Sequence, residues 1–318
     1  MKKCIAFLSL LLMLLGCLPG TPQDGQTGEN GDKTPPDEIP PHSDSIKIAS
    51  FNIQVFGQTK AGKPEVMDIL AQIIRRYDIV AIQEIRNIAE TAIITLKDKV
   101  NEDGSSYAVV TGPRVGRTRS KEQYAYMYNT ETIDDPTGAY TYDDDGDGNG
   151  VNDIDDSIHP NDLFEREPYV AHFKVKWGTF DFVLINIHTK PDHAETEIGY
   201  LPGVITDALT RIGETDVICL GDFNADGSYF DEDTYLSVFP ADRYYWLVPN
   251  SADTNLAASD RTYDRIVTTL SMDEDYADTW GVFRFDQEYD FSSPTMDPDD
   301  VSDHYPVWAE FYIDMDTD

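Results

Sequence analysis

Polar residues that could bind a metal ion or carry a proton stand directly beside six apolar runs of this sequence. They are Asn52, Glu84, His188, Asp222 with Asn224, Asp264, and Asp303 with His304. In α/β proteins, strand ends from separate parts of the chain converge on one crevice. The pattern therefore predicts that these side chains share a site. Each residue alone also fits a turn, a gap in the core or a solvated position, so the prediction depends on their number.

The residue types suit two kinds of chemistry. Carboxylate and amide oxygens are hard ligands that suit Mg²⁺, Mn²⁺ or Ca²⁺. Two histidines with carboxylates available as partners suit proton transfer near neutral pH. No group of Cys and His residues has the spacing of a zinc site. A metal ion, a base and an acid together are what hydrolysis of a phosphodiester requires.

The apolar runs predict strands, and a few helical stripes lie between them. Strands are expected at 46–53, 79–82, 107–111, 124–128, 169–175, 180–188, 217–220, 265–269 and 307–312. Helices are expected at 64–74, at 88–100 and at 193–212, where Pro202 must kink or interrupt the helix. Many strands with a few intervening helices indicate an α/β fold with mixed sheets.

Composition excludes several classes of protein. The 318 residues carry 24 Lys and Arg against 59 Asp and Glu, a formal net charge of −35. Such a chain is no charge-driven binder of polyanions, so any contact with nucleic acid needs local Arg residues or a metal ion. The 40% hydrophobic and 11% aromatic content excludes a wholly disordered chain. Three cysteines exclude a disulfide-dense scaffold, and Cys219 is expected to be a small core residue.

The first 45 residues predict an export signal and a tether. Residues 1–17 have a basic start and an apolar run too short to span a bilayer, which is typical of a signal peptide. Their end, LLGC, resembles a bacterial lipobox, so Cys17 is expected to carry lipid and to anchor an exported lipoprotein in the cell envelope. An ordinary secretory signal is the alternative. Residues 18–45, with six Pro and four Gly, predict a flexible tether, and 46–314 is the expected folded domain.

Several segments within 46–314 carry a family resemblance. They include IKIASFNIQVFGQTK, RRYDIVAIQEIRN, GRTRSKEQYAYMY, FEREPYVAHFK, GDFNADGSY and SDHYPV. In this order they resemble the endonuclease/exonuclease/phosphatase superfamily, most closely its deoxyribonuclease I type. The resemblance implies a four-layer α/β sandwich of two packed mixed β-sheets flanked by helices. It also implies endonucleolytic hydrolysis of DNA by an activated water, dependent on a divalent metal ion.

The resemblance assigns roles to the polar positions. The residues that would position Mg²⁺ or Mn²⁺ and the phosphate are Asn52, Glu84, Asp222, Asn224 and Asp303. Glu122 would orient His188, and Asp264 would orient His304. His304 would be the general base that takes a proton from water, and His188 the acid that protonates the leaving 3′ oxygen. Asp222 and Asn224 would complete this catalytic group.

Four further residues stand where the deoxyribonuclease I type contacts DNA, namely Arg86, Arg117, Arg166 and Tyr263. The alternative for a lone Arg is a solvated surface position. Gln54 and Ser120 depart from the type, which has an Arg and a Tyr that reach into the minor groove. Losing both predicts weaker duplex binding or an altered site preference. Duplex DNA remains the expected substrate, and single strands or RNA stay open.

An acidic segment at 143–156, DDDGDGNGVNDIDD, resembles the first half of an EF-hand loop without its final Glu. Asp162 and Glu167 lie near positions that bind calcium in the deoxyribonuclease I type, and Asp253 lies near those of a second calcium site in that type. The expected calcium residues are Asp143, Asp145, Asp147, Asp153, Asp162, Glu167 and Asp253. A structural Ca²⁺ is therefore predicted, and the alternative is a solvated acidic turn.

Two other functions stay open at this point. One is a related phosphodiesterase that acts on sphingomyelin, RNA or nucleotides. The other is a catalytically silent, calcium-stabilised binding module on the cell surface. No protein partner is evident from the sequence.

Overall fold

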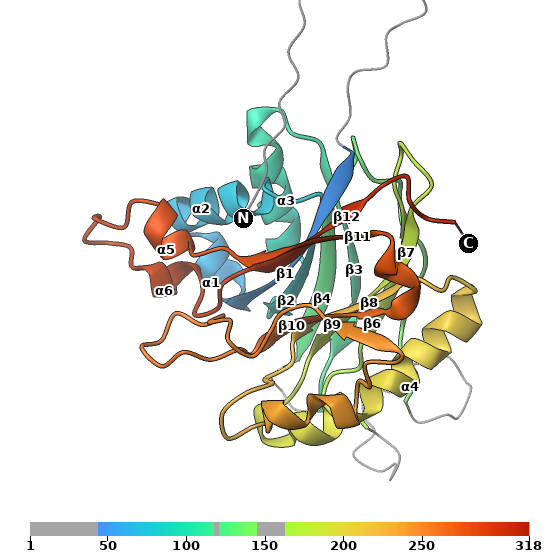
Figure 1. Cartoon of the computed structure of the whole chain (residues 1–318). Coiled ribbons are helices and arrows are strands. Elements are labelled where there is room, and N and C mark those ends of the chain that lie inside the picture. Colours follow the sequence, from blue (N-terminus) through green and yellow to red (C-terminus); the bar gives the residue numbers. More distant parts are fainter. Residues whose placement is uncertain (1–43, 118–120, 145–162, 318) are drawn as a thin grey trace, which may run out of the picture. The chain divides into compact units, whose positions relative to one another are not determined.

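The computed structural model describes residues 44–117, 121–144 and 163–317, which contain two six-stranded β-sheets (Figure 1). These residues belong to one compact unit, His42–Asp318. The predicted signal peptide with Cys17, and the predicted tether up to residue 43, lie outside the described residues. None of the helices in the described ranges has the length and apolar character needed to cross a bilayer.

The first sheet has the strand order β11-β12-β1-β2-β4-β3. Its strands are β1 (Ser45–Phe56), β2 (Ile79–Ile85), β3 (Tyr107–Val115), β4 (Glu122–Asn129), β11 (Tyr276–Val282) and β12 (Val307–Tyr312). β1 and β2 are parallel, and every other pair in this sheet is antiparallel.

The second sheet has the order β5-β6-β7-β8-β10-β9. Its strands are β5 (Thr137–Thr141), β6 (Tyr169–Lys174), β7 (Asp181–His188), β8 (Val217–Asp222), β9 (Tyr244–Trp246) and β10 (Asp264–Thr269). Only β7 and β8 are parallel in this sheet. Both sheets are therefore mixed, as predicted.

Helices cover the outer faces of the sheets. The α-helices are α1 (Gln58–Ala61), α2 (Pro64–Ile74), α3 (Ala92–Val100), α4 (Ala194–Ile212), α5 (Phe285–Glu288) and α6 (Pro298–Val301). Short 3₁₀ turns occupy η1 (Asn101–Asp103), η2 (Pro191–His193), η3 (Glu232–Ser237) and η4 (Leu270–Asp273). Val66 of α2 and Leu96 of α3 share a core with Phe51 of the first sheet. Leu201 of α4 shares another hydrophobic core with Val183 of the second sheet.

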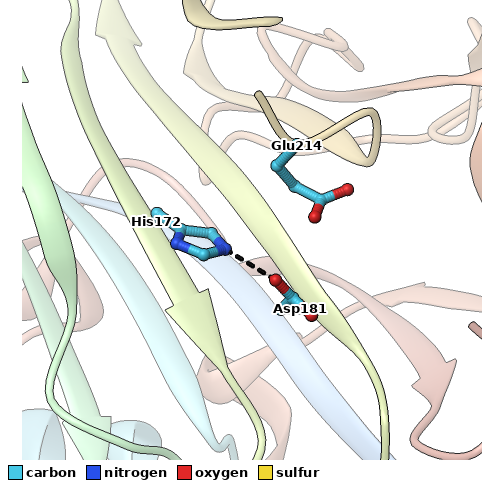
Figure 2. A group of neighbouring side chains, drawn as sticks. All are labelled: His172, Asp181 and Glu214. Carbon is cyan, nitrogen blue, oxygen red and sulfur yellow. Dashed lines mark hydrogen bonds and ion pairs between the residues drawn. The ribbon is translucent and has the colours of Figure 1, made fainter. Parts of the chain in front are cut away.

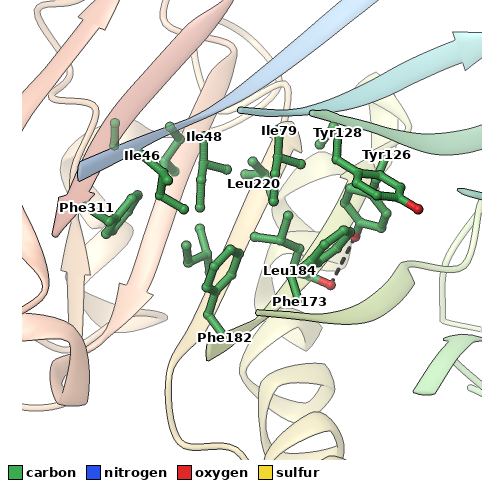
Figure 3. Close-up of a cluster of buried hydrophobic side chains, with 14 of the residues drawn as sticks. Ile46, Ile48, Ile79, Tyr126, Tyr128, Phe173, Phe182, Leu184, Leu220 and Phe311 are labelled. Atoms are coloured by element: carbon green, nitrogen blue, oxygen red, sulfur yellow. Dashed lines mark hydrogen bonds between the residues drawn. The ribbon is translucent and has the colours of Figure 1, made fainter. Parts of the chain in front are cut away.

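A third core fills the space between the two sheets (Figure 3). Ile48 and Ile79 of the first sheet lie in the same buried cluster as Phe182, Leu184 and Leu220 of the second. Apolar side chains therefore face both sides of each sheet, which makes the central strands continuously hydrophobic. The order of layers is helices, sheet, sheet, helix, and it confirms the predicted four-layer sandwich.

Most predicted elements appear with small changes at their ends. The helix expected at 88–100 begins at Ala92, and the Asn87 side chain from the preceding loop accepts hydrogen bonds from the Thr91 and Ala92 amides. α4 runs without interruption through Pro202. Strands β5, β9 and β11 were not predicted: none of their residues is fully buried, β5 and β11 mix polar and apolar residues, and β9 has only three residues. Cys219 is buried, as expected.

A polar link joins the two sheets inside this core. The Gln83 side chain on β2 donates a hydrogen bond of 2.7 Å to Oδ1 of Asn186 on β7. The Asn186 amide donates to the Ile82 and Ala125 carbonyls of the first sheet. Gln83 and Asn186 are fully buried, so each needs its partners to offset lost hydration. The hydrogen bond between Gln83 and Asn186 fixes how β7 lies against β2, and Asn186 stands only two residues before His188.

We expect Asn186→Ala to lower the free energy of unfolding by about 2–3 kcal/mol, because it leaves the Gln83 amide without its best acceptor. Urea unfolding of the full chain measures this change. Thr196→Ala, at an exposed position of α4, is the control and should stay within about 0.5 kcal/mol of the parent. Equal stability of the two variants would show that the link does not hold the sheets together.

Candidate active site

Three of the predicted site residues lie side by side across the second sheet. His188 at the end of β7 pairs in register with Asp222 at the end of β8, and Asp222 pairs with Asp264 at the start of β10. Gly221 allows this close packing, because a Cβ there would lie 1.8 Å from the Ile187 carbonyl oxygen and its φ is +152°. The convergence that the apolar runs predicted is therefore produced by strand register.

His188 is held by a carboxylate from the opposite sheet. Its Nδ1 lies 2.8 Å from Oε2 of Glu122 on β4, and its backbone amide donates to the Tyr124 hydroxyl. Glu122 is buried and also contacts the guanidinium groups of Arg86 at 2.7 Å and Arg166 at 3.4 Å. Burial alone would raise the pKa of Glu122, but His188 and the two arginines outweigh it and lower the pKa to about 2. Glu122 is therefore a fixed anion that orients the imidazole.

His304 is held in the same way from the other side. Its Nδ1 lies 2.8 Å from Oδ2 of Asp264, and its backbone amide donates to Ser302 Oγ. Burial opposes the charged imidazolium, but the charges of Asp264 and Asp222 prevail and raise the pKa of His304 well above its usual value. In the protein without bound cations His304 therefore carries a proton at neutral pH.

Both histidines direct their second ring nitrogen at one oxygen. His188 Nε2 and His304 Nε2 each lie 3.5 Å from Oδ2 of Asp222. The same oxygen accepts a hydrogen bond of 3.0 Å from the side-chain amide of Asn52. The other oxygen of Asp222, Oδ1, accepts a hydrogen bond from the backbone amide of Asn224. Burial would raise the pKa of Asp222, but the two histidines and these donors lower it. The two imidazoles thus flank a single, fully buried carboxylate.

Glu84 extends the site toward the first sheet. Asn52 donates to Glu84 Oε1 across 3.4 Å, and Glu84 Oε2 accepts from the Val55 amide and lies 3.2 Å from Arg86. Glu84 and Val55 have φ angles of +61° and +49°, a strained conformation that these contacts maintain. The register between β1 and β2 also shifts between Asn52 and Phe56, where Val55 lies.

The donor set fits a hard divalent cation. Asp222, Asp264 and His304 each offer a ligand atom, and these atoms lie within 4.8 Å of one another. Asp303 Oδ1 is shielded from solvent, lies 4.0 Å from His304 Nε2 and accepts no hydrogen bond from the described residues. The Asn52 amide presents its nitrogen to the carboxylates, because its oxygen accepts from the Gln54 amide. Asp222 and Asp303 therefore offer carboxylate oxygens to a cation in this site.

The predicted DNA contacts differ in exposure. Arg117 is exposed, and Arg86 is partly exposed between Glu84 and Glu122. Arg166 is buried, and its guanidinium donates to the His188 and Thr189 carbonyls. Arg166 thus braces the loop after β7. The ring of Tyr263 lies beside that of His304, with 6.1 Å between centroids.

Two residues that join the strand-end loops were not predicted. Lys60 of α1 donates to the Ile53 carbonyl at 3.1 Å and to the Val301 carbonyl at 3.0 Å. Burial lowers the pKa of Lys60 to about 8, although Asp303 and Glu84 act in the opposite direction. Ser302 Oγ donates to the Asn52 carbonyl. The only sequence signal for Lys60 was its place in the segment FGQTK, which gives no role to a single residue.

The predicted calcium residues are only partly described. Asp145, Asp147, Asp153 and Asp162 lie outside the described residues, as does Ser120. Asp143 is partly exposed, and Glu167 is buried. Asp253 already has a cationic partner, since its Oδ2 lies 2.7 Å from the guanidinium of Arg284, which in turn stacks on Tyr305.

Comparison with known proteins gives consistent findings. The sequence model of the Endonuclease/Exonuclease/phosphatase family matches residues 49–304. Deoxyribonuclease-1 of Oryctolagus cuniculus is 34% identical over 275 residues, which cover 83% of this chain and 91% of that protein. Deoxyribonuclease-1 of Homo sapiens is 34% identical over 269 residues with the same coverage.

Solved structures agree on the fold. An endonuclease/exonuclease/phosphatase family protein from Bacteroides thetaiotaomicron superposes with a TM-score of 0.59 at 18% identity, covering 85% of this chain and 98% of that one. The human Nocturnin catalytic domain superposes with a TM-score of 0.53 at 13% identity. The match covers 84% of this chain and 93% of that one.

We expect Glu122→Gln to remove on the order of 2–3 kcal/mol from the free energy of unfolding at pH 7, measured with chelator present. The carboxyl has a lower pKa in the folded protein than its ordinary value of 4.5. Its contribution is therefore complete above pH 4.5 and falls to about half at pH 3. Urea unfolding at both pH values, with exposed Glu195→Gln as control, checks this. A stability gap that does not shrink at pH 3 would contradict the assignment.

Proposed function

The chain belongs to the endonuclease/exonuclease/phosphatase family and is a phosphodiester hydrolase, and from this premise we propose that it is an exported, divalent-metal-dependent deoxyribonuclease. The observation that carries the proposal is the pair of carboxylate-held histidines directed at one buried oxygen of Asp222. Two proton-transfer groups on either side of a single position suit in-line displacement at phosphorus, where one oxygen attacks and another leaves.

The two histidines divide the proton transfers. Each donates its Nδ1 proton to a carboxylate, so that only Nε2 exchanges a proton with the substrate. His304 is the base toward water, and His188 is the acid toward the leaving 3′ oxygen. Asp222 is one of three anions, with Asp264 and Asp303, that hold a proton on His304, so neutralising its charge lowers the pKa of His304 and prepares it as a base.

A divalent cation, Mg²⁺ or Mn²⁺, would be held by Glu84, Asp222 and Asp303 with Asn52 and Asn224 beside them. When bound, it stabilises negative charge on the phosphoryl oxygens. The need for it is strong in this chain, because a formal net charge of −35 repels DNA. Arg86, between Glu84 and Glu122, would supply positive charge at the rim of the site. Arg117 is exposed and would add to it if its loop meets the DNA.

DNA is favoured as the substrate by the similarity to proteins named deoxyribonuclease-1 at 34% identity over most of the chain. One observation favours a related phosphodiesterase. Gln54, where the deoxyribonuclease I type has an Arg, lies next to the site and accepts a hydrogen bond from Lys60 instead of adding charge to the rim. RNA, single-stranded DNA and sphingomyelin are therefore the comparison substrates.

We propose that the enzyme works outside the cytoplasm, anchored by lipid on Cys17. The support for this is the basic and apolar start, the LLGC segment and the Pro- and Gly-rich tether of residues 18–45. A structural Ca²⁺ at the acidic segment around Asp143, Asp145 and Asp147 is part of the same proposal.

Plasmid nicking by the full chain in Mg²⁺ and Ca²⁺ should be abolished by EDTA. We expect His188→Ala and His304→Ala each to reduce nicking by at least about 10²-fold, because each removes a positioned proton-transfer group. His193→Ala, at an exposed position in η2, is the control and should match the parent. Unchanged nicking in either test variant would refute the proposal. Cleavage of RNA or sphingomyelin by the parent with no cleavage of DNA would favour the related phosphodiesterase.

Thermal unfolding should show the structural Ca²⁺. We expect Ca²⁺ to raise the melting temperature of the full chain by roughly 5 °C over the value in chelator, since binding to the folded state alone shifts the equilibrium. Asp145→Asn with Asp147→Asn should remove the rise, whereas exposed Asp192→Asn should keep it. Identical midpoints with and without Ca²⁺ in the parent protein would reject the site.

A further inference from the structure

A second group of a histidine and two carboxylates lies far from the active site (Figure 2). It consists of His172 on β6, Asp181 at the start of β7, and Glu214 in the loop between α4 and β8. One ligand atom from each residue lies within 4.8 Å of the other two. β7 runs from Asp181 to His188, so the group is separated from the active site by the length of that strand, roughly 23 Å.

The imidazole of His172 is oriented as a metal ligand would be. Its Nδ1 lies 3.2 Å from the Thr137 hydroxyl of β5, and its Nε2 lies 2.9 Å from Oδ2 of Asp181. Histidines that bind metals commonly donate their other ring N–H to such an outer partner. Without a metal ion, Nε2–H donates to the Asp181 carboxylate and Nδ1 accepts from the Thr137 hydroxyl. A bound cation would take the place of the Nε2 proton, and Nδ1–H would then donate to Thr137.

Charge around the group also favours a cation. Glu214 directly follows Gly213, the C-cap of the 19-residue helix α4, where the helix dipole contributes partial negative charge. A third carboxylate, that of Asp316, accepts a hydrogen bond from the Asp181 amide across 3.3 Å. A cationic neighbour, Lys174, lies 3.3 Å from the other oxygen of Asp181, and its side chain is 52% exposed and can move into solvent.

We propose that His172, Asp181 and Glu214 form a site for a divalent transition-metal ion of the zinc type. An imidazole nitrogen with two carboxylate oxygens is a donor set of intermediate softness, which zinc accepts and which Mg²⁺ and Ca²⁺ disfavour. Ligand atoms on a tetrahedral zinc ion stand roughly 3.3 Å apart, as follows from bonds of about 2.0–2.1 Å. His172 and Asp181 are already close to this separation. The Glu214 carboxylate, whose Oε1 also accepts a hydrogen bond of 2.8 Å from the Asp216 amide, offers an oxygen within 4.8 Å of both and would move closer on binding.

The bound ion would join two parts of the chain that are distant in sequence. It would connect the β6–β7 pair to the segment that leads from α4 into β8. Because the ion binds the folded chain and not the unfolded one, it would raise stability without taking part in hydrolysis. No zinc spacing is visible in the sequence, since the ligands come from three separate elements.

Calorimetric titration of the full chain with Zn²⁺ in excess Mg²⁺ tests the site. Mg²⁺ occupies sites made of oxygen ligands, and any Zn²⁺ bound at the active site is common to all variants. We expect the parent and the control His193→Ala to bind one more Zn²⁺ than His172→Ala. Equal stoichiometry in the parent and in His172→Ala, or equal loss in the control, would overturn the proposal.

A second variant guards against a general effect of His172→Ala on folding. Glu214→Gln keeps the contact between His172 and Asp181, and we expect it to weaken Zn²⁺ binding by about 10-fold or more. Zn²⁺ should also raise the melting temperature of the parent and not that of His172→Ala. Binding unchanged in Glu214→Gln would exclude the three-residue site. Plasmid nicking in Mg²⁺ should be the same in all these variants, so a failure here is distinct from a failure of the nuclease proposal.

Discussion

A single buried carboxylate, that of Asp222, sets the arrangement of the active site. Taking an anion out of water is costly unless other groups compensate its charge, and Asp222 is almost completely buried. Compensation comes from four directions, namely His188, His304, the Asn52 amide and the backbone of Asn224. Each of these groups lies within 3.5 Å of an oxygen of the Asp222 carboxylate. The same requirement that stabilises the anion places two imidazoles on either side of one position.

The site is a seam between the ends of the two sheets. Glu122 belongs to the first sheet and holds His188 of the second. His304 precedes a strand of the first sheet and is held by Asp264 of the second. Asn52 and Asp222 make a third contact across the seam. Any shift of one sheet against the other would break all three contacts, which explains the value of the buried link between Gln83 and Asn186 just beneath them.

The sequence predicted the strands, the mixed sheets and the polar strand ends well, because these depend on local patterns. The four-layer sandwich was implied by the family resemblance. α2 shows a regular apolar stripe, and the central strands β1, β7 and β8 are strongly hydrophobic runs that end in polar residues. Edge strands such as β5 and β9 carry little pattern, since one face meets solvent and pairing alone defines them. The burial of Arg166 and the bridging role of Lys60 depend on loops meeting in space, and spacing along the chain cannot reveal them. The group around His172 was missed for the same reason.

Crystals of the full chain soaked with Mn²⁺ and inorganic phosphate would test the central claim most directly, through the anomalous scattering of manganese. The account predicts a manganese peak in bonding contact with the carboxylates of Glu84 and Asp222. It also predicts a phosphate whose oxygens lie within hydrogen-bonding distance of Nε2 of both His188 and His304. Manganese bound elsewhere with none at this seam, or a phosphate that contacts neither imidazole, would contradict it.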